Sequence, residues 1–177
     1  MSAEGVSPDL LASVRAGDRD GLSRLYERFA DDVYRVALRL TGSSADAYDV
    51  AHDVFVGLPE ALQRYSERAS FGPWLRRVTA RAALMHLRSQ RRRREVTLTA
   101  LQGMAVGSRP DPAVDRLSLE RAIARLPDPL RAVYVLREVE GFSYEEVGEM
   151  LGIKRNAAEV RLHRARNRLR ILLGADR

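Results

Sequence analysis

The chain has 177 residues, a formal net charge of +6 at pH 7 and no cysteine. The length suits one ordinary domain or two small ones, the basic excess favours a polyanionic partner, and the missing thiols exclude disulfides and thiolate metal sites. No apolar run approaches the roughly 18 residues that a membrane span needs, and the acidic start lacks the layout of a signal peptide. We therefore expect a soluble cytoplasmic protein without membrane insertion.

The first half of the chain has the pattern of amphipathic helices. Apolar residues recur at spacings of three and four over residues 22–40, and Gly42 then offers a C-terminal stop. A second helix is predicted over Ser44–Arg64. Pro59 is expected to kink or shorten that helix, because proline removes a backbone donor and crowds the preceding turn.

A third helix and a linker follow. After a loop over Tyr65–Ser70, the spacing predicts a helix over Phe71–Arg91 that ends in the four arginines Arg91–Arg94. Those arginines are either a solvated helix end stabilised by the macrodipole or a contact to DNA phosphates. Residues 95–113 keep no helical period and contain glycine and proline, which predicts a flexible linker with room for one short helix around Leu98–Met104.

The second half of the chain is also helical in pattern. The helical spacing returns at Val114, stops at Pro127 and resumes as far as Gly141. No segment alternates for long enough to form a sheet. We therefore predict an all-α protein of two small helical domains, residues 1–94 and residues 114–177, joined by the flexible linker.

Residues 142–170 have the pattern of a helix, a tight turn and a second, basic helix. Ser143 can cap the first helix, Glu146 is placed to reach back in a capping box, and Gly152 provides the turn. A helix-turn-helix of this kind places its second helix in the major groove of DNA. The alternative is a helical hairpin within an α-helical core. The inner face of the second helix is expected to be Ala158, Leu162, Ala165 and Leu169.

The outward side of this second helix combines a mixed polar centre with basic flanks, as base readout and phosphate positioning require. Glu159 is the one acid on the helix. It could accept a hydrogen bond from a cytosine amino group or pair with His163 one turn along. The residues expected to face DNA are Arg155, Asn156, Ala157, Glu159, Val160, Arg161, His163 and Arg164.

Both halves, in this order and at this separation, resemble a known family. Residues 25–56 and 70–93 resemble region two, and residues 124–153 and 161–166 resemble region four, of the extracytoplasmic-function (group four) sigma factors of bacterial RNA polymerase. The resemblance implies two small helical domains that bind core RNA polymerase and direct promoter-specific transcription initiation. It also implies contact with promoter DNA, both as duplex and as melted strand, and control by an anti-sigma protein.

The resemblance assigns polymerase binding to the stretch Asp49–Phe55. The acids of this stretch suit basic residues on a partner, whereas the alternative for Asp49 and Asp53 is a merely solvated face. His52 stands where family members often carry Gln, and it is expected to make a polar contact rather than bind a metal, since no second ligand lies at suitable spacing. The residues implied in polymerase binding are Asp49, His52, Asp53 and Phe55.

Capture of an unstacked base of the minus-ten element is implied for the loop before the third helix. Phe71 and Trp74 either line the pocket for that base or pack in the hydrophobic core, and core packing is favoured for Trp74. Arg81 stands where the family commonly has Asn, and Met85 stands where it often has Asp. These two differences leave the identity of the preferred minus-ten base open. The residues implied in minus-ten binding, with the helix arginines on phosphates, are Arg64, Ser70, Phe71, Trp74, Arg76, Arg77, Arg81 and Arg88.

Region four is implied to read the minus-thirty-five element in the major groove. Here Asn156–Val160 replaces the family's common Gly-Thr-Val-Lys-Ser, which removes hydroxyls and adds an acid. The specificity of this chain is therefore expected to depart from that of its relatives.

The sequence carries no catalytic constellation. The three histidines lie on different segments, and no glycine-rich phosphate loop occurs. We expect no enzymatic activity, no cofactor and no bound metal. The competing hypotheses are an autonomous helix-turn-helix regulator with an N-terminal sensor or dimerisation domain and, more distantly, a nucleic-acid enzyme such as a nuclease.

Overall fold

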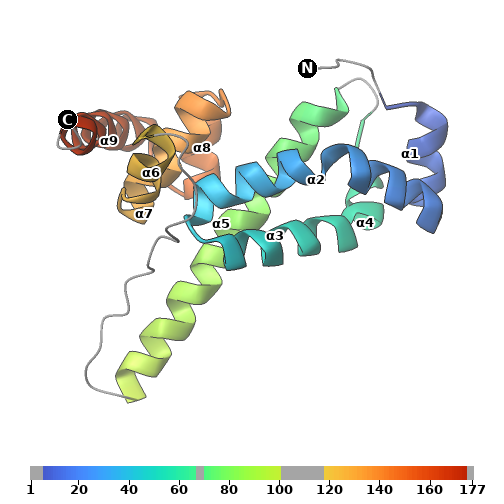
Figure 1. Ribbon diagram of the computed structural model, residues 1–177, viewed down its shortest axis with the longest axis horizontal. Helices are drawn as coiled ribbons and strands as arrows, with labels where there is room; N and C mark the ends of the chain where they lie inside the picture. Colours follow the sequence, from blue (N-terminus) through green and yellow to red (C-terminus); the bar gives the residue numbers. More distant parts are fainter. Residues whose placement is uncertain (1–5, 67–69, 101–117, 175–177) are drawn as a thin grey trace.

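Helices are the regular elements of residues 6–66, 70–100 and 118–174, which are the residues that the computed structural model describes (Figure 1). Within these ranges the all-α prediction is confirmed. The N-terminal helices are α1 (Pro8–Arg15), α2 (Arg19–Thr41), α3 (Ser44–Val56), α4 (Leu58–Leu62) and α5 (Phe71–Ala100). The C-terminal helices are α6 (Ser118–Ala124), α7 (Asp128–Tyr134), its π-helical continuation η1 (Val135–Val139), α8 (Tyr144–Leu151) and α9 (Arg155–Gly174).

Local signals set the limits of α2 and α3. The carboxylate of Asp18 accepts hydrogen bonds from the amides of Asp20 and Gly21, so it caps the start of α2. At the end of α2, Gly42 adopts a left-handed conformation with φ +70°, which confirms the predicted stop. Ser43 then caps α3 through its side-chain oxygen.

The predicted helix over residues 44–64 is divided into α3 and α4. The division falls at Gly57, and Pro59 lies in the first turn of α4. Proline is tolerated there because the first-turn amides have no partner within the helix. The expectation that Pro59 would shorten the helix is confirmed.

The helix α5 is longer than the sequence indicated. We expected it to end in Arg91–Arg94, but its backbone remains helical to Ala100. The prediction was wrong because the β-branched residues of this stretch lower helix propensity only slightly. Extending a helix that has already formed also costs little free energy. The rest of the predicted linker, including residues 101–104 of the expected short helix, lies outside the described residues, as does the predicted helical start over residues 114–117.

The N-terminal core forms where α2 packs against α3 and α5, while α1 lies against α4 (Figure 1). Its fully buried side chains include Leu25, Leu40, Leu58, Leu62 and Leu75. Burying a leucine contributes about 1.5–3 kcal/mol. The apolar stripe of α2 therefore fixes the position of α5, the helix that carries most of the predicted minus-ten residues.

The C-terminal domain folds around α9, against which α6, α7 and α8 pack. The inner face predicted for this helix is confirmed, since Ala158, Leu162, Ala165 and Leu169 are all buried. The two domains also touch each other: α6 and α7 lie against the C-terminal end of α2, and α8 lies against α5 (Figure 1).

Candidate nucleic-acid interface

The first helix of the helix-turn-helix has the predicted capping box. The amide of Glu146 donates to Ser143 Oγ at 3.2 Å, and Glu146 Oε2 accepts from the amide of Ser143 at 2.8 Å. The backbone hydrogen bond from Ser143 is the main cause that lowers the pKa of Glu146, and burial opposes it. Both bonds satisfy amides that would otherwise lack partners at the start of α8.

Two glycines shape the turn between α8 and α9. Gly152 has φ +65°, as the sequence predicted. Sequence reasoning missed Gly148. The backbone of the turn passes so close to it that a Cβ atom there would lie 2.8 Å from the carbonyl oxygen of Ile153. The amide of Ile153 donates to the carbonyl of Gly148 at 2.9 Å. A glycine within an otherwise regular helical pattern was the available signal for this close approach.

The predicted DNA-facing side of α9 is largely exposed. Val160 is 51% exposed, and Asn156, His163 and Arg164 are exposed as well. Ala157 and Arg161 are only partly exposed. The side opposite the buried face thus offers a methyl-bearing and polar centre of the kind that reads base edges.

Arg155 is held at the start of α9 by two carboxylates and a ring. Its Nη1 donates to Glu145 at 2.7 Å, its Nε donates to Glu159 at 2.9 Å, and its guanidinium lies 5.9 Å from the centroid of Tyr144. These carboxylates raise the pKa of Arg155, with Glu159 the largest contributor. Glu159 is therefore paired with Arg155, and the proposed pairing with His163 is wrong: His163 Nε2 instead lies 3.0 Å from Asn167 Nδ2.

Of the four α3 residues implied in polymerase binding, all except Phe55 are exposed. Asp49, His52 and Asp53 are exposed, and His52 Nδ1 lies 3.7 Å from Asp53 Oδ1. Phe55 is only 5% exposed and packs edge-on against Tyr26, with ring centroids 4.9 Å apart. The assignment of Phe55 to a partner surface was wrong, because its ring completes the contact between α2 and α3.

Exposed apolar side chains accompany the acids of α3. Tyr48 is 66% exposed and Val56 is 64% exposed. Sequence reasoning missed both, although each is a large apolar residue outside the inner stripe predicted for this helix. Together with Asp49 and Asp53 they form a surface that combines acidic and apolar groups.

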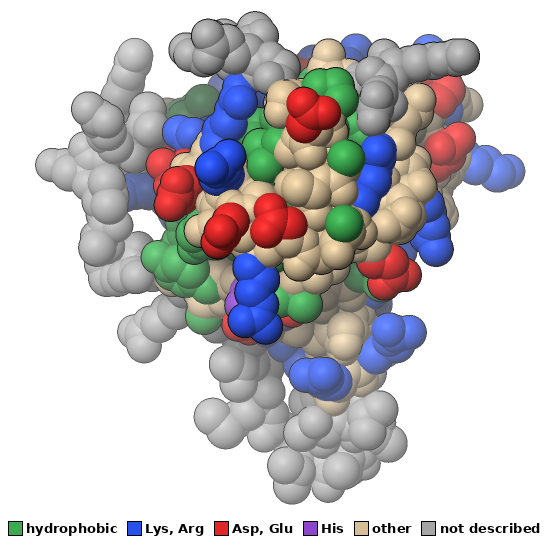
Figure 2. Space-filling view, turned by 90° about the vertical axis from the view of Figure 1, so that its right-hand side faces the viewer, with side chains coloured by type: hydrophobic (Ala, Val, Ile, Leu, Met, Phe, Trp, Pro, Cys, Tyr) green, Lys and Arg blue, Asp and Glu red, His purple; other side chains and the backbone are tan. Residues whose placement is uncertain are grey.

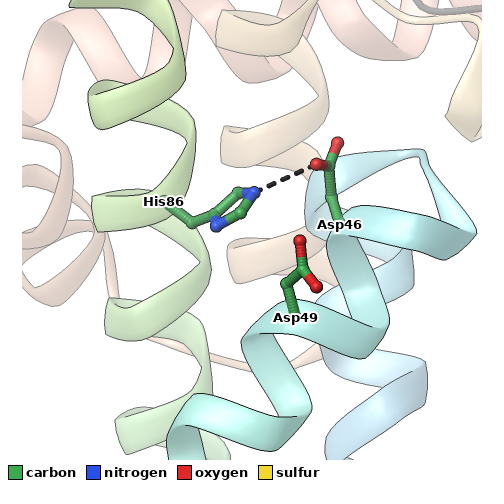
Figure 3. A group of neighbouring side chains, drawn as sticks. All are labelled: Asp46, Asp49 and His86. Atoms are coloured by element: carbon green, nitrogen blue, oxygen red, sulfur yellow. Dashed lines mark hydrogen bonds and ion pairs between the residues drawn. The ribbon is translucent and has the colours of Figure 1, made fainter.

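A polar cluster ties α3 to α5 (Figure 3). His86 Nε2 lies 3.0 Å from Asp46 Oδ1, and Gln90 donates to the same oxygen. Asp49 points toward the pair, and ligand-capable atoms of Asp46, Asp49 and His86 lie within 4.8 Å of one another. Since Asp46 already accepts from an imidazole and an amide, these hydrogen bonds account for the cluster as a link between the two helices.

The aromatic residues expected near the minus-ten base pack together. Phe71 is 5% exposed, and its ring centroid lies 5.1 Å from Phe29, 5.6 Å from Trp74 and 5.9 Å from Tyr65. Trp74 is half-buried on Tyr65, with centroids 4.9 Å apart. Three rings from α2, α5 and the loop thus bury Phe71, which agrees with the core-packing alternative for this residue. Arg64 and Ser70 are exposed, and residues 67–69 of the loop lie outside the described residues.

Three of the four α5 arginines that were expected to contact phosphates instead contact the C-terminal domain. Arg76 Nε lies 3.8 Å from Glu140 Oε2, Arg77 forms a hydrogen-bonded ion pair with Glu146, and Arg88 donates to the carbonyl of Met150. Arg81 is exposed. These partners were not foreseen from the sequence.

Charge is unevenly spread over the molecule. The end that carries α1 and α4 shows acidic, basic and hydrophobic side chains interspersed (Figure 2). The basic residues expected to meet DNA belong to α5, α9 and the loop before α5. Among the described residues, no helix is both long enough and apolar enough to cross a lipid bilayer.

Comparison with known proteins agrees with this division into two regions. The family model for sigma-70 region 2 matches residues 25–93, and the model for sigma-70 region 4 matches residues 116–169. The chain is 36% identical to the ECF RNA polymerase sigma factor SigE of Mycolicibacterium smegmatis, over 82% of this chain and 59% of that protein. It is also 36% identical to the RNA polymerase sigma factor CarQ of Myxococcus xanthus, over 90% of this chain and 93% of that protein.

Solved structures show the same fold. The sigma factor RpoE of Bartonella quintana, in complex with the anti-sigma factor NepR, superposes with a TM-score of 0.61 at 21% identity, covering 88% of this chain and 98% of that chain. CnrH, in complex with the cytosolic domain of CnrY, superposes with a TM-score of 0.55 at 25% identity, covering 95% of this chain and 97% of that chain.

A helical region 2 followed by a helix-turn-helix region 4 defines a sigma-70-type transcription initiation factor. With relatives such as CarQ matched over nearly their whole length, the chain belongs to the extracytoplasmic-function sigma factors of RNA polymerase. It is a DNA-binding protein, not an enzyme, and it directs RNA polymerase to begin transcription at promoters. The alternative of an autonomous regulator is not favoured by these matches.

Proposed function

We propose that this sigma factor reads the minus-thirty-five element with the outward side of α9. The observation that carries the proposal is the division of this helix into a buried face and an exposed side with Asn156, Val160 and His163 at its centre. A helix fixed by its apolar face presents its other side at a constant angle, which major-groove readout requires. Arg161 and Arg164 flank the centre and supply phosphate contacts.

We also propose that residues 1–94 form the polymerase-binding and minus-ten-binding domain, that residues 95–113 link the domains, and that residues 114–177 form the minus-thirty-five domain. The acids Asp49 and Asp53, with His52 between them, contact basic groups of core polymerase. Their exposure beside two apolar side chains supports this assignment, because interfaces combine an apolar centre with a polar rim.

Minus-ten binding is assigned to α5 and the loop before it. Arg76, Arg77, Arg81 and Arg88 lie along one helix and contact phosphates of the melted strand. Trp74, which is half-buried three residues before Arg77, offers a ring face for stacking. The loop residues Arg64 and Ser70 flank the place of the unstacked base.

The working location of such a protein is the cytoplasm, where RNA polymerase and the genome are. An anti-sigma protein is proposed as its second protein partner. The solved complexes of RpoE with NepR and of CnrH with the cytosolic domain of CnrY support that proposal.

Run-off transcription with core RNA polymerase and fragmented genomic DNA tests the function. The purified protein is expected to produce discrete start sites that core polymerase alone does not produce. Asp49→Asn combined with Asp53→Asn is expected to abolish them by preventing assembly, whereas Asp20→Asn, an exposed acid at the start of α2, is the matched control. If no new start sites appear with the unaltered protein, the proposed function is wrong.

A further inference from the structure

The polar cluster between α3 and α5 has the composition of a metal site (Figure 3). Asp46 and Asp49 are about one turn apart on α3, and His86 approaches them from α5. Residues three apart on a helix share a face, so both carboxylates meet the same neighbour. Carboxylates and an imidazole on facing helices form a ligand set that helical proteins use for metal ions.

The spacing of the ligand atoms suits a single ion. His86 Nε2 and Asp46 Oδ1 are 3.0 Å apart. Two atoms that each lie about 2.0–2.2 Å from one ion are about 2.8–3.6 Å apart in octahedral or tetrahedral geometry. A carboxylate oxygen of Asp49 lies within 4.8 Å of both atoms. Because Asp49 is exposed, its side chain is free to rotate and bring that oxygen into the same range.

The hydrogen bonds that link the two helices leave His86 Nε2 with conflicting neighbours. Gln90 Nε2 donates to Asp46 Oδ1 and also lies 3.0 Å from His86 Nε2. A proton on His86 Nε2 satisfies Asp46 but faces the amide protons of Gln90. A lone pair there satisfies Gln90 but faces the carboxylate of Asp46. A metal ion bound by that lone pair and by an oxygen of Asp46 removes the repulsion between them.

Gln90 acts as a positioning residue for this cluster. Arg94 donates to Gln90 Oε1 at 3.4 Å, which turns the amide nitrogen of Gln90 toward Asp46. Carboxylates that bind metals are usually held by hydrogen bonds from residues outside the ligand set. The orientation of Asp46 is therefore fixed before an ion arrives.

The cluster is partly enclosed and open on one side. The side chains of His86 and Asp46 are 20% and 17% exposed, whereas Asp49 is exposed. Partial burial strengthens the attraction between an ion and two carboxylates because less water screens it. The side of Asp49 provides the path by which an ion enters.

The ligand types select the class of ion. Magnesium and calcium take oxygen ligands, so the imidazole of His86 argues against both. Copper(I) prefers thiolate and thioether ligands, and the chain has no cysteine. Zinc binds histidine nitrogen and aspartate oxygen together, and three protein ligands leave a position for water.

We propose that Asp46, Asp49 and His86 bind one divalent first-row transition metal ion, with zinc as the favoured species. The sequence gave no sign of this site because His86 lies 40 residues after Asp46. Ligand spacing in the sequence identifies a metal site only when the ligands are close in the chain.

The site shares one residue with the surface proposed to contact core polymerase. A bound ion neutralises the carboxylate of Asp49 and turns it toward α5. Bound zinc therefore weakens assembly with core polymerase. This consequence rests on the function proposed above, whereas the metal site itself rests only on the geometry of the cluster.

Calorimetric titration of the full chain with zinc, without a histidine tag, tests the site. One zinc ion should bind per chain. His86→Gln and Asp46→Asn should each weaken zinc binding at least about tenfold, because each removes a direct ligand. His163→Gln is the matched control, since His163 is an exposed histidine on α9, and its zinc affinity should equal that of the unaltered chain.

Nuclear magnetic resonance identifies the ligand atom. Zinc should shift the nitrogen resonance of His86 Nε2 and leave His163 unshifted at one equivalent. Circular dichroism verifies that His86→Gln and Asp46→Asn keep their helix content. Magnesium in place of zinc should cause no shift of His86. Absence of zinc binding, equal zinc affinities for His86→Gln and His163→Gln, or an unshifted His86 resonance would overturn the proposed site.

Run-off transcription with and without added zinc tests the consequence. Zinc should reduce initiation by the unaltered chain more than initiation by His86→Gln, and effects of zinc on the polymerase itself are common to both reactions. If zinc binds but reduces both reactions equally, the proposed effect on assembly is wrong and the metal site stands. If zinc binds but no form of the chain initiates transcription without zinc, the proposed function fails.

Discussion

Replacement of Arg131 by methionine is the sharpest test of how the two domains are held together. Methionine fills much of the space of the arginine stem but has no donor. The change removes the five hydrogen bonds that the guanidinium makes, to Leu40, Thr41, Ala124, Leu126 and Asp128. Four of the acceptors are backbone carbonyls, which cannot leave the contact without moving a helix end.

The expected loss of stability follows from these partners. At about 1.5–3 kcal/mol for each bond to a charged group, five bonds would total far more than is observed for single replacements. The sum overcounts, because burial disfavours the charged guanidinium and lowers the pKa of Arg131, while the Asp128 side chain, 66% exposed, returns to water at little cost. Removal of one member of a buried charged network costs about 3–5 kcal/mol, which we take as the expected loss.

Thermal unfolding followed by circular dichroism measures the effect. For a chain of this size, about 3–5 kcal/mol corresponds to a fall in Tm of roughly 6–20 °C. Arg125→Met is the matched control, since this exposed arginine lies six residues earlier on the same segment, and its Tm should stay within about 2 °C. Arg131→Lys should fall between the two, because an ammonium group has three donors and a shorter reach. Equal Tm values for Arg131→Met and Arg125→Met would refute the reasoning.

Three further predictions concern the helix-turn-helix and the contact between domains. Gly148→Ala should destabilise the C-terminal domain by about 1–3 kcal/mol in urea unfolding, because its Cβ would meet the carbonyl of Ile153; an unchanged midpoint would show that the turn can relax. Glu159→Gln should weaken the preference for one base pair of the minus-thirty-five element by about 1–3 kcal/mol, measured by competition binding with a randomised duplex. Glu149→Gln, at an exposed position of α8, should leave that preference unchanged. Identical base preferences for the two variants would show that Glu159 does not read a base. Burial raises the pKa of Glu140, with Arg76 and Arg39 opposing the rise and Asp32 adding to it, so the folded chain takes up a proton at Glu140 more readily than the unfolded chain. The Glu140 contribution to the free energy of unfolding is therefore complete below the ordinary pKa of 4.5 and is lost as pH rises through the raised pKa, and the pH dependence of Tm over this window should be weaker in Glu140→Gln.

The parts of the fold that could be predicted from the sequence depend on neighbours a few residues away. The capping box of Ser143 and Glu146, the left-handed Gly42 and the inner face of α9 are set within one or two helical turns. Phe55 was misplaced, and the position of Phe71 was left open, for the opposite reason. Their burial depends on aromatic rings of α2, and helical spacing alone does not distinguish a core ring from one that lines a binding pocket.

The contact between domains lay beyond sequence reasoning because its partners are remote in the chain. Arg131 and Asp128 have the spacing of an ordinary surface pair on a helix. The carbonyls of Leu40 and Thr41 that bury the guanidinium lie 91 and 90 residues earlier, and a carbonyl has no sequence signature at all. Any residue type at these positions offers the same acceptor, so only the folded backbone reveals the cap.

This remoteness also changes how the net charge of +6 is to be interpreted. A count of arginines treats each one as available to DNA. In the structure Arg39, Arg76 and Arg77 face acids of the other domain, so the basic surface that a nucleic acid meets is smaller than the composition indicates. The affinity of this sigma factor for DNA is therefore expected to fall less steeply with salt concentration than its count of arginines implies, because paired arginines neutralise fewer phosphates.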